Sequence, residues 1–114
     1  MKTVALRTGD AIVCERCAVA STPFARMRGL LGRRRLDSGE GILLRPASSV
    51  HTFFMRFPID VVFLGRDGDV LKIARSLAPW RTAGARGAKS VVELPAGEAE
   101  RRGLRTGDRL EVPV

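Results

Sequence analysis

The sequence of 114 residues contains no long hydrophobic run and no tyrosine, and it has one histidine, one tryptophan and two cysteines. No apolar run approaches the roughly 20 residues that a membrane-spanning helix needs, so we expect no membrane partner. The first ten residues also lack a long apolar run after Lys2, and they are not expected to be a signal peptide. We therefore expect a cytoplasmic protein.

Internal repeats, low-complexity tracts and linkers are also missing from the chain. A chain of this length is long enough for one hydrophobic core but not for two. The hydrophobic residues make up 45% of the sequence, which is ordinary for a globular protein. Residues 1–114 are therefore expected to form a single domain.

Long helical patterns are absent, and short strand-like segments with turn signals dominate. The clearest of these is a hairpin of residues 59–64 and 70–74, because Asp67-Gly68 between them tolerates the positive φ angles of a tight turn. Other expected strands are residues 3–6, 11–13, 41–44, 51–57, 90–94 and 109–112. The pattern predicts a mainly β fold: a compact antiparallel β-sandwich or barrel of about seven short strands with two short helices.

The first helix is expected to begin at Thr22-Pro23, because Thr can cap the free N–H groups and Pro suits the first helical position. Its apolar stripe is expected to consist of Phe24, Met27, Leu30 and Leu31, and Gly32 is expected to end it. A second short helix is expected at residues 97–103, and residues 77–89 are expected to form an exposed loop.

Residues 50–65 hold four of the five phenylalanines and the only histidine. Both faces of this stretch are largely apolar, which indicates a buried central strand or pair of strands broken at Pro58. The polar residues within it are His51, Arg56 and Asp60, and burial would make them costly unless they are paired. Alternation places Phe53 and Phe54 on opposite faces, which is poor for a stacking platform.

Two interpretations of these polar residues are open. Asp60 either pairs with His51 or Arg56 to anchor a ligand, or it accepts backbone N–H bonds as a buried structural group. Trp80 beside Arg81 either stacks on a ligand or folds back over one end of the sheet. No Ser or Cys stands in a recognisable nucleophile motif near His51, so we expect a binding site rather than an enzyme.

Cys14 and Cys17 form a Cys-x-x-Cys pair. Such a pair is half of a zinc site, a redox dithiol, or two buried reduced thiols. Zinc is the one cofactor that the sequence suggests, and His51 is the only further soft ligand, so a zinc site would need a second copy of the chain.

The formal net charge is +8, and almost all of the positive charge comes from arginine. The densest basic cluster contains Arg26, Arg28, Arg33, Arg34 and Arg35, of which the last three are expected at the negative end of the helix dipole. A basic domain favours phosphate-bearing partners. Nucleic acid is therefore a second partner class, although no recognised nucleic-acid motif is present.

Four segments of the chain share a pattern with a known family: Gly29-Leu30, residues 41–44, the Phe-Met-x-x-Pro-Ile-Asp core of residues 54–60, and Glu-Leu-x-Ala-Gly at residues 93–97. Through these segments the chain resembles the prokaryotic domain-of-unknown-function family 192. The resemblance implies a compact, mainly β domain and supplies no catalytic residues. The Cys pair is not part of the shared pattern.

The leading hypothesis is a non-enzymatic module that binds a small ligand or a protein through His51, Arg56, Asp60, Trp80 and Arg81. The alternatives are a basic protein that associates with nucleic acid and a metal- or thiol-dependent protein that uses the Cys pair.

Overall fold

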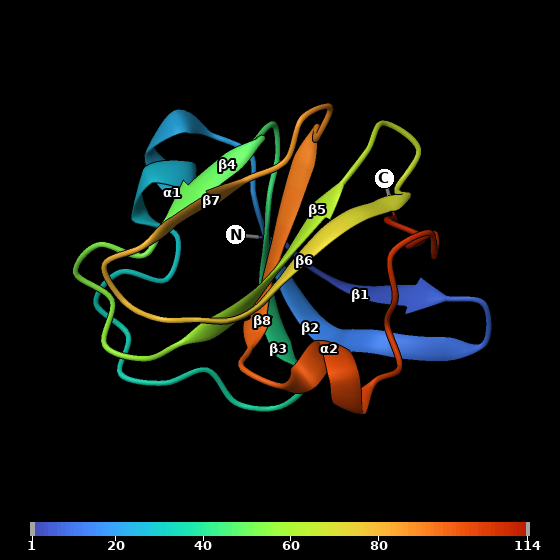
Figure 1. The fold of residues 1–114 in the computed structure, drawn as a ribbon, viewed down its shortest axis with the longest axis horizontal. Helices are drawn as coiled ribbons and strands as arrows, with labels where there is room; N and C mark the ends of the chain where they lie inside the picture. The colour runs from blue at the N-terminus through green and yellow to red at the C-terminus, as the bar shows by residue number, and fades with distance from the viewer. Residues whose placement is uncertain (1, 114) are drawn as a thin grey trace.

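The computed structural model describes residues 2–113, without the side chains of Phe24, Met27 and Arg28. This part of the chain forms eight strands and two short helices, which confirms the mainly β class (Figure 1). No helix in it is long and apolar enough to cross a membrane. The elements are β1 (Thr3–Thr8), β2 (Ala11–Ala20), α1 (Pro23–Arg28), β3 (Glu40–Leu44), β4 (Ser49–His51), β5 (Ile59–Leu64), β6 (Val70–Leu77), β7 (Thr82–Gly84), β8 (Ser90–Pro95) and α2 (Glu98–Arg101).

The main sheet has six strands in the order β1-β2-β3-β8-β5-β6, and β4 and β7 form a separate two-stranded sheet. The pairs are antiparallel apart from β2 and β3, which run parallel and are joined through α1. The parallel pairing of β2 and β3 differs from the expected wholly antiparallel arrangement. A short helix suffices for the connection between these two strands because the irregular residues 29–39 complete it. β1 and β6 form opposite edges, so the sheet is not a closed barrel.

The main sheet carries a hydrophobic cluster on each face. The first cluster includes Leu43, Val62, Val92 and Leu104, and it is completed by the segment after α2. The second includes Ile42, Val61, Val91 and Met55, and the small sheet β4–β7 and the region after α1 pack on it. Because β5 and β8 lie between the two clusters, every residue of both strands is buried.

The hairpin of β5 and β6 confirms the turn predicted at Asp67-Gly68, where Gly68 has a φ angle of 86°. The first half of the central stretch is different. Its strand β4 ends at His51, and residues 52–58 leave the extended conformation, with Phe54 at a φ of 67°. The prediction of a buried strand over residues 51–57 was therefore wrong, because tertiary contacts of this segment outweigh its alternating pattern.

The start of α1 is confirmed: the Thr22 side chain accepts a hydrogen bond from Ala25 N at 3.1 Å. The helix ends earlier than expected, at Arg28, because Gly29 takes a φ of 46°. Phe24 and Met27 of the expected stripe lie outside the described side chains. The expected loop at residues 77–89 contains β7, and residues 109–112 form isolated bridges rather than a strand.

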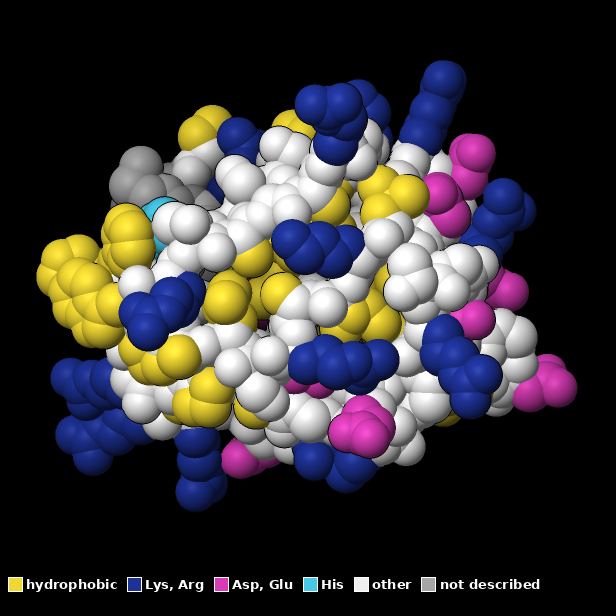
Figure 2. Space-filling view, viewed as in Figure 1, with side chains coloured by type: hydrophobic (Ala, Val, Ile, Leu, Met, Phe, Trp, Pro, Cys, Tyr) yellow, Lys and Arg dark blue, Asp and Glu magenta, His cyan; other side chains and the backbone are white. Residues whose placement is uncertain are grey.

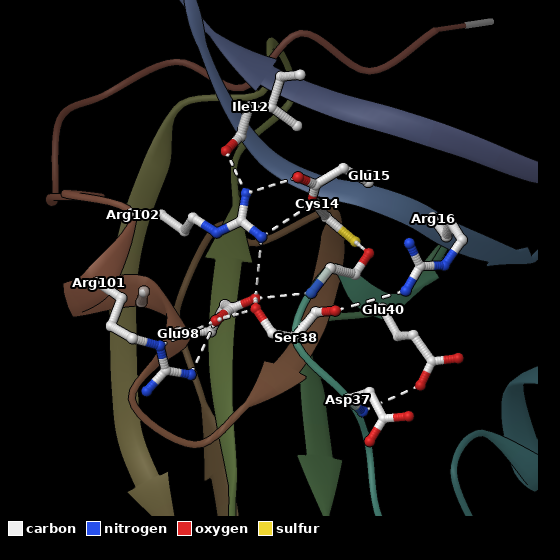
Figure 3. Close-up of polar contacts among 12 residues, drawn as sticks. Ile12, Cys14, Glu15, Arg16, Asp37, Ser38, Glu40, Glu98, Arg101 and Arg102 are labelled. Atoms are coloured by element: carbon white, nitrogen blue, oxygen red, sulfur yellow. Dashed lines mark hydrogen bonds and ion pairs between the residues drawn. The ribbon is translucent and has the colours of Figure 1, made fainter.

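A buried carboxylate, Glu98, attaches α2 to the rest of the molecule (Figure 3). It accepts hydrogen bonds from Gly39 N at 2.9 Å and from Ser38 Oγ, and it forms ion pairs with Arg101 and Arg102. Burial raises the pKa of Glu98, but these hydrogen bonds and the Arg102 charge outweigh that effect and leave the pKa below its usual value. Glu98 lies in the first turn of α2, where a negative charge also interacts favourably with the helix dipole. Its hydrogen bonds to residues 38 and 39 add a tertiary contact.

Candidate functional site

A pocket of about 390 Å³ opens between α1, the loop that follows β3, and β4. Its apolar walls are built by Leu30, Leu31, Leu44, Val50 and Met55. Its polar lining includes Arg26, Ser48, Ser49, His51 and Glu93. The volume lies within the range of pockets that hold small organic molecules. The lining combines apolar and polar groups in similar measure.

Glu93 on β8 brings a carboxyl group from the sheet to this pocket. Its Cα partners are Ile42 on β3 and Val61 on β5, so its side chain lies on the face of the second hydrophobic cluster. The residue is only 4% exposed, and no hydrogen bond or ion pair to its carboxyl group is found within residues 2–113. Burial raises the pKa of Glu93 to about 7. This carboxyl therefore changes charge near neutral pH.

Gly29 keeps the carboxyl group of Glu93 open to the pocket. A Cβ atom at position 29 would lie 3.8 Å from Glu93 Oε1, so a larger side chain would cover the carboxyl. The positive φ angle of Gly29 also favours glycine there. Gly29 thus ends α1 and opens the pocket at the same point.

Four aromatic rings gather beside the mouth of this pocket and form a cluster that we call the aromatic tip: His51, Phe53, Phe54 and Trp80. Trp80 lies 5.9 Å from Phe53 and 4.7 Å from Phe54 between ring centroids. Phe54 is 71% exposed and Trp80 is 55% exposed. His51 belongs to both features, because it also lines the pocket. The expectation that Phe53 and Phe54 diverge was wrong, since their segment turns instead of extending.

The buried residue Thr52 holds the two loops of the aromatic tip together. Its Oγ1 donates a hydrogen bond to Ala78 O at 2.6 Å and accepts one from Arg81 N at 2.9 Å. Its carbonyl oxygen accepts a hydrogen bond from Trp80 N at 3.0 Å. Phe54 and Trp80 both take positive φ angles, which cost conformational energy in residues other than glycine. The rings are therefore presented by a rigid and locally strained backbone.

The end of the molecule that carries the aromatic tip is basic. No Asp or Glu occurs in residues 41–59 or 70–92, whereas Arg56, Arg81 and Arg86 in these segments are exposed. Figure 2 shows the single histidine beside a protruding hydrophobic group with Lys and Arg around it, while most acidic side chains lie toward the other end and the lower edge. This end is thus suited to an anionic partner with an aromatic or apolar part.

Asp60 does not share the site with His51. Its carboxylate is fully buried, and it accepts hydrogen bonds from Ser76 N at 2.8 Å and from Ala99 N at 3.0 Å. Neither His51 nor Arg56 is among its partners in residues 2–113. The structural interpretation, in which Asp60 binds backbone N–H groups, accounts for this geometry. Of the predicted ligand residues, His51, Trp80 and Arg81 lie together at the aromatic tip, and Arg56 follows in the same turn.

Cys14 and Cys17 lie fully buried in the first hydrophobic cluster. The β1–β2 pairing contains a register shift between the pairs Val4–Cys17 and Leu6–Cys14, so that β2 has one more residue than β1 over this interval. The extra residue brings both thiols to the same face of the sheet.

Cys14 Sγ donates a hydrogen bond to Gly39 O, and Cys17 Sγ donates one to Ala18 O. The interaction between the two thiols lowers the pKa of Cys14 and, with burial, raises that of Cys17. In the described part of the chain, no group of three or more His, Cys, Asp or Glu side chains is placed so that it could hold a metal ion. A zinc site shared between two copies stays a prediction.

The predicted basic cluster is spread over α1 and the irregular stretch after it. Arg33 pairs with Glu40 at 3.1 Å and Arg35 pairs with Asp37 at 3.2 Å. Arg26 donates a hydrogen bond to Ser21 O, Arg34 is exposed, and the Arg28 side chain lies outside the described residues. Arg33–Arg35 do not follow the helix directly as expected, because α1 ends at Arg28.

Sequence reasoning missed Glu93 as a site residue. The signal was present, because Glu93 is the only charged residue in the six-residue strand Ser-Val-Val-Glu-Leu-Pro. A charged residue in a strand that is buried on both faces needs either a partner or a function. Only the structure shows that Glu93 has no partner among the described residues and lines a pocket.

Comparisons with known proteins agree on the family. The sequence profile of DUF192, described as an uncharacterized ACR, matches residues 4–112. A UPF0127 protein of Thermococcus sibiricus is 33% identical over 104 residues, which cover 87% of this chain and 67% of that protein. A UPF0127 protein of Pyrococcus furiosus is 45% identical over 65 residues, which cover 56% of this chain and 55% of that protein.

Two solved structures have a similar fold. A protein of unknown function from Novosphingobium aromaticivorans gives a TM-score of 0.85 at 27% identity, covering 96% of this chain and 85% of that chain. A protein from Sinorhizobium meliloti, described as a candidate transcription regulator, gives a TM-score of 0.83 at 27% identity. The match covers 96% of this chain and 91% of that chain. The fold, the matched residues and the relatives together show that this chain belongs to the DUF192 family.

Proposed function

We propose that this protein is a non-enzymatic module that binds a small organic ligand in the pocket above Glu93. The observation that carries the proposal is the buried carboxyl group of Glu93, which has no partner in the described residues and lines a pocket of about 390 Å³. An unpartnered buried carboxyl costs stability, and the fold makes no visible use of it. A ligand that supplies the missing partner would explain its presence.

The surroundings of Glu93 favour binding over catalysis. Ser48 and Ser49 line the same pocket as His51, but the described residues include no hydrogen bond between a serine hydroxyl and His51. His51 Nδ1 instead accepts a hydrogen bond from Phe53 N at 3.3 Å. Activation of a nucleophile by a general base needs direct contact between the two groups. Thus His51 belongs to the wall of a binding site in this arrangement.

The test is an NMR titration of isotope-labelled protein with a library of small organic fragments at pH 7. At least one fragment is expected to shift the amide signals of Leu30, Val50 and Met55 in the wild type and in Glu100→Gln, which removes an exposed carboxylate elsewhere. Glu93→Gln is expected to bind that fragment at least about tenfold more weakly, because a charged hydrogen-bond partner is lost. Fragments that bind all three proteins equally, or that leave the pocket signals unmoved, would contradict the proposal.

A second candidate function is the binding of single-stranded nucleic acid at the aromatic tip. The observation that favours it is the combination of exposed rings with unopposed arginines, since bases stack on aromatic side chains while Arg and Lys neutralise phosphates. The similar structure from Sinorhizobium meliloti, described as a candidate transcription regulator, is compatible with this candidate.

Fluorescence anisotropy with labelled single-stranded RNA and DNA tests this candidate. We expect the logarithm of the binding constant to fall linearly with log[salt], with a slope of about −0.7 for each phosphate that the protein neutralises. Arg81→Ala removes one such contact and is expected to make the slope shallower by about 0.7. Trp80→Ala is expected to cost about 1–3 kcal/mol of binding through lost stacking. Arg109→Ala, an exposed arginine outside the basic end, serves as the control. If Arg81→Ala and Arg109→Ala reduce the affinity for nucleic acid equally, binding at the aromatic tip is contradicted.

A further inference from the structure

The chemistry of the pocket narrows the class of its ligand. The carboxyl of Glu93 shares the pocket with the apolar side chains of Leu44, Val50 and Met55. Its neighbours across the sheet, Ile42 and Val61, offer neither a donor nor a charge. An ionised carboxylate finds its strongest partners in ammonium and guanidinium groups. The apolar walls require that such a group be carried on a hydrocarbon stem, as the long stems of Lys and Arg side chains are.

We propose, on the basis of the function proposed above, that the ligand is an aliphatic compound whose terminal ammonium or guanidinium group pairs with Glu93. The stem of the ligand packs against the apolar walls between the mouth of the pocket and Glu93. Pairing with the ligand supplies the charge partner that the described residues do not provide. The pocket therefore selects a cation by its buried carboxylate and a hydrocarbon stem by its walls.

A cationic side chain in the lining adds a second element of selection. Arg26 on α1 lines the pocket and donates a hydrogen bond to Ser21 O, and His51 on β4 lines it as well. The positive charge of Arg26 disfavours a second cationic group on the ligand and favours an anionic one. A ligand with one cationic end and one anionic end fits the pocket better than a diamine does.

The pH dependence of binding follows from the state of Glu93. Its pKa in the free protein is about 7, because burial disfavours the ionised form. A cation binds to the ionised form, so its affinity is expected to be constant above pH 7 and to fall about tenfold per pH unit below it. Arg26 and His51 are the other charged or titratable side chains that line this pocket within the described residues.

The experiment is an isothermal calorimetry and NMR series with defined probes at pH 8 and pH 6. The cationic probes are n-butylammonium, n-butylguanidinium, agmatine and 4-guanidinobutyrate, and the isosteric controls are butyramide and butyrate. We expect the singly charged cations to bind the wild type and Glu100→Gln, with agmatine weaker and 4-guanidinobutyrate tighter than n-butylguanidinium. Glu93→Gln is expected to lose at least about tenfold in affinity for each cation.

The control arms separate this inference from the function on which it rests. Binding of butyramide or butyrate in the pocket, undiminished by Glu93→Gln, would overturn the cationic ligand and leave a ligand-binding pocket standing. An equal affinity for the cationic probes at pH 6 and pH 8 would also overturn the cationic ligand and leave a ligand-binding pocket standing. If none of the probes moves the signals of Leu30, Val50 and Met55, and no fragment of the library does so, both proposals are overturned.

Discussion

Replacing Glu93 with Gln is expected to make the protein more stable by about 3 kcal/mol at pH 8 and to leave its stability nearly unchanged at pH 4.5. The pKa of Glu93 is about 7 in the folded protein, against an ordinary value of 4.5. Between these values the unfolded chain releases its proton while the folded protein retains it. The stability contributed by the neutral carboxyl is therefore complete below pH 4.5 and is lost as the pH rises to 7.

Urea denaturation followed by circular dichroism, at pH 4.5, 6 and 8, measures this effect. The difference between the wild type and Glu93→Gln isolates Glu93, because the carboxylates with lowered pKa, such as Glu15 and Glu98, contribute equally to both proteins. Glu100→Gln, which removes an exposed carboxylate, serves as the control variant. A constant difference between wild type and Glu93→Gln at all three pH values would mean that Glu93 has an ordinary pKa and a partner in solution.

Replacing Asp60 with Ala is expected to lower the free energy of unfolding by about 4 kcal/mol. Asp60 is fully buried, and its two oxygens each accept one backbone N–H, from Ser76 and from Ala99. Gly97, the residue before α2, has no side chain to cap the helix, so Asp60 on β5 supplies the cap from a distant part of the chain. Ser76 has a φ of 48°, and its N–H would also lose its partner. Hydrogen bonds to a charged acceptor contribute about 1.5–3 kcal/mol each.

Asp60→Asn and Asp67→Ala make this prediction specific. Asn retains one acceptor but sets its amide N–H₂ against the other backbone N–H, so a loss of about 2 kcal/mol is expected. Asp67 is exposed in the β5–β6 turn, and its replacement should cost less than about 1 kcal/mol. Thermal and urea denaturation provide the values. An Asp60→Ala protein as stable as Asp67→Ala would show that the carboxylate does not hold α2 and the end of β6 together.

Elements with a local signal could be predicted from the sequence. Asp67-Gly68 between two apolar runs predicted the β5–β6 hairpin, and Thr22-Pro23 predicted the start of α1. Both signals act between residues close in the chain, through positive φ angles at Gly68 and through a hydrogen bond that spans three residues. The aromatic tip could not be predicted in this way, because its geometry depends on Thr52, which bonds to residues 26 to 29 positions away.

The sequence by itself determined the mainly β class, the single domain, the basic charge and the central place of residues 59–64, because composition and periodicity are properties of the chain alone. The tertiary structure decided what each polar residue in that framework does. Asp60 and Glu93 are both acids in apolar strands, and nothing local distinguishes them. One meets two backbone N–H groups and stabilises the fold, while the other meets no partner in the described residues and faces a pocket. The difference arises from which distant segments pack against each strand, since the cost or benefit of a buried carboxylate depends on the partners it finds.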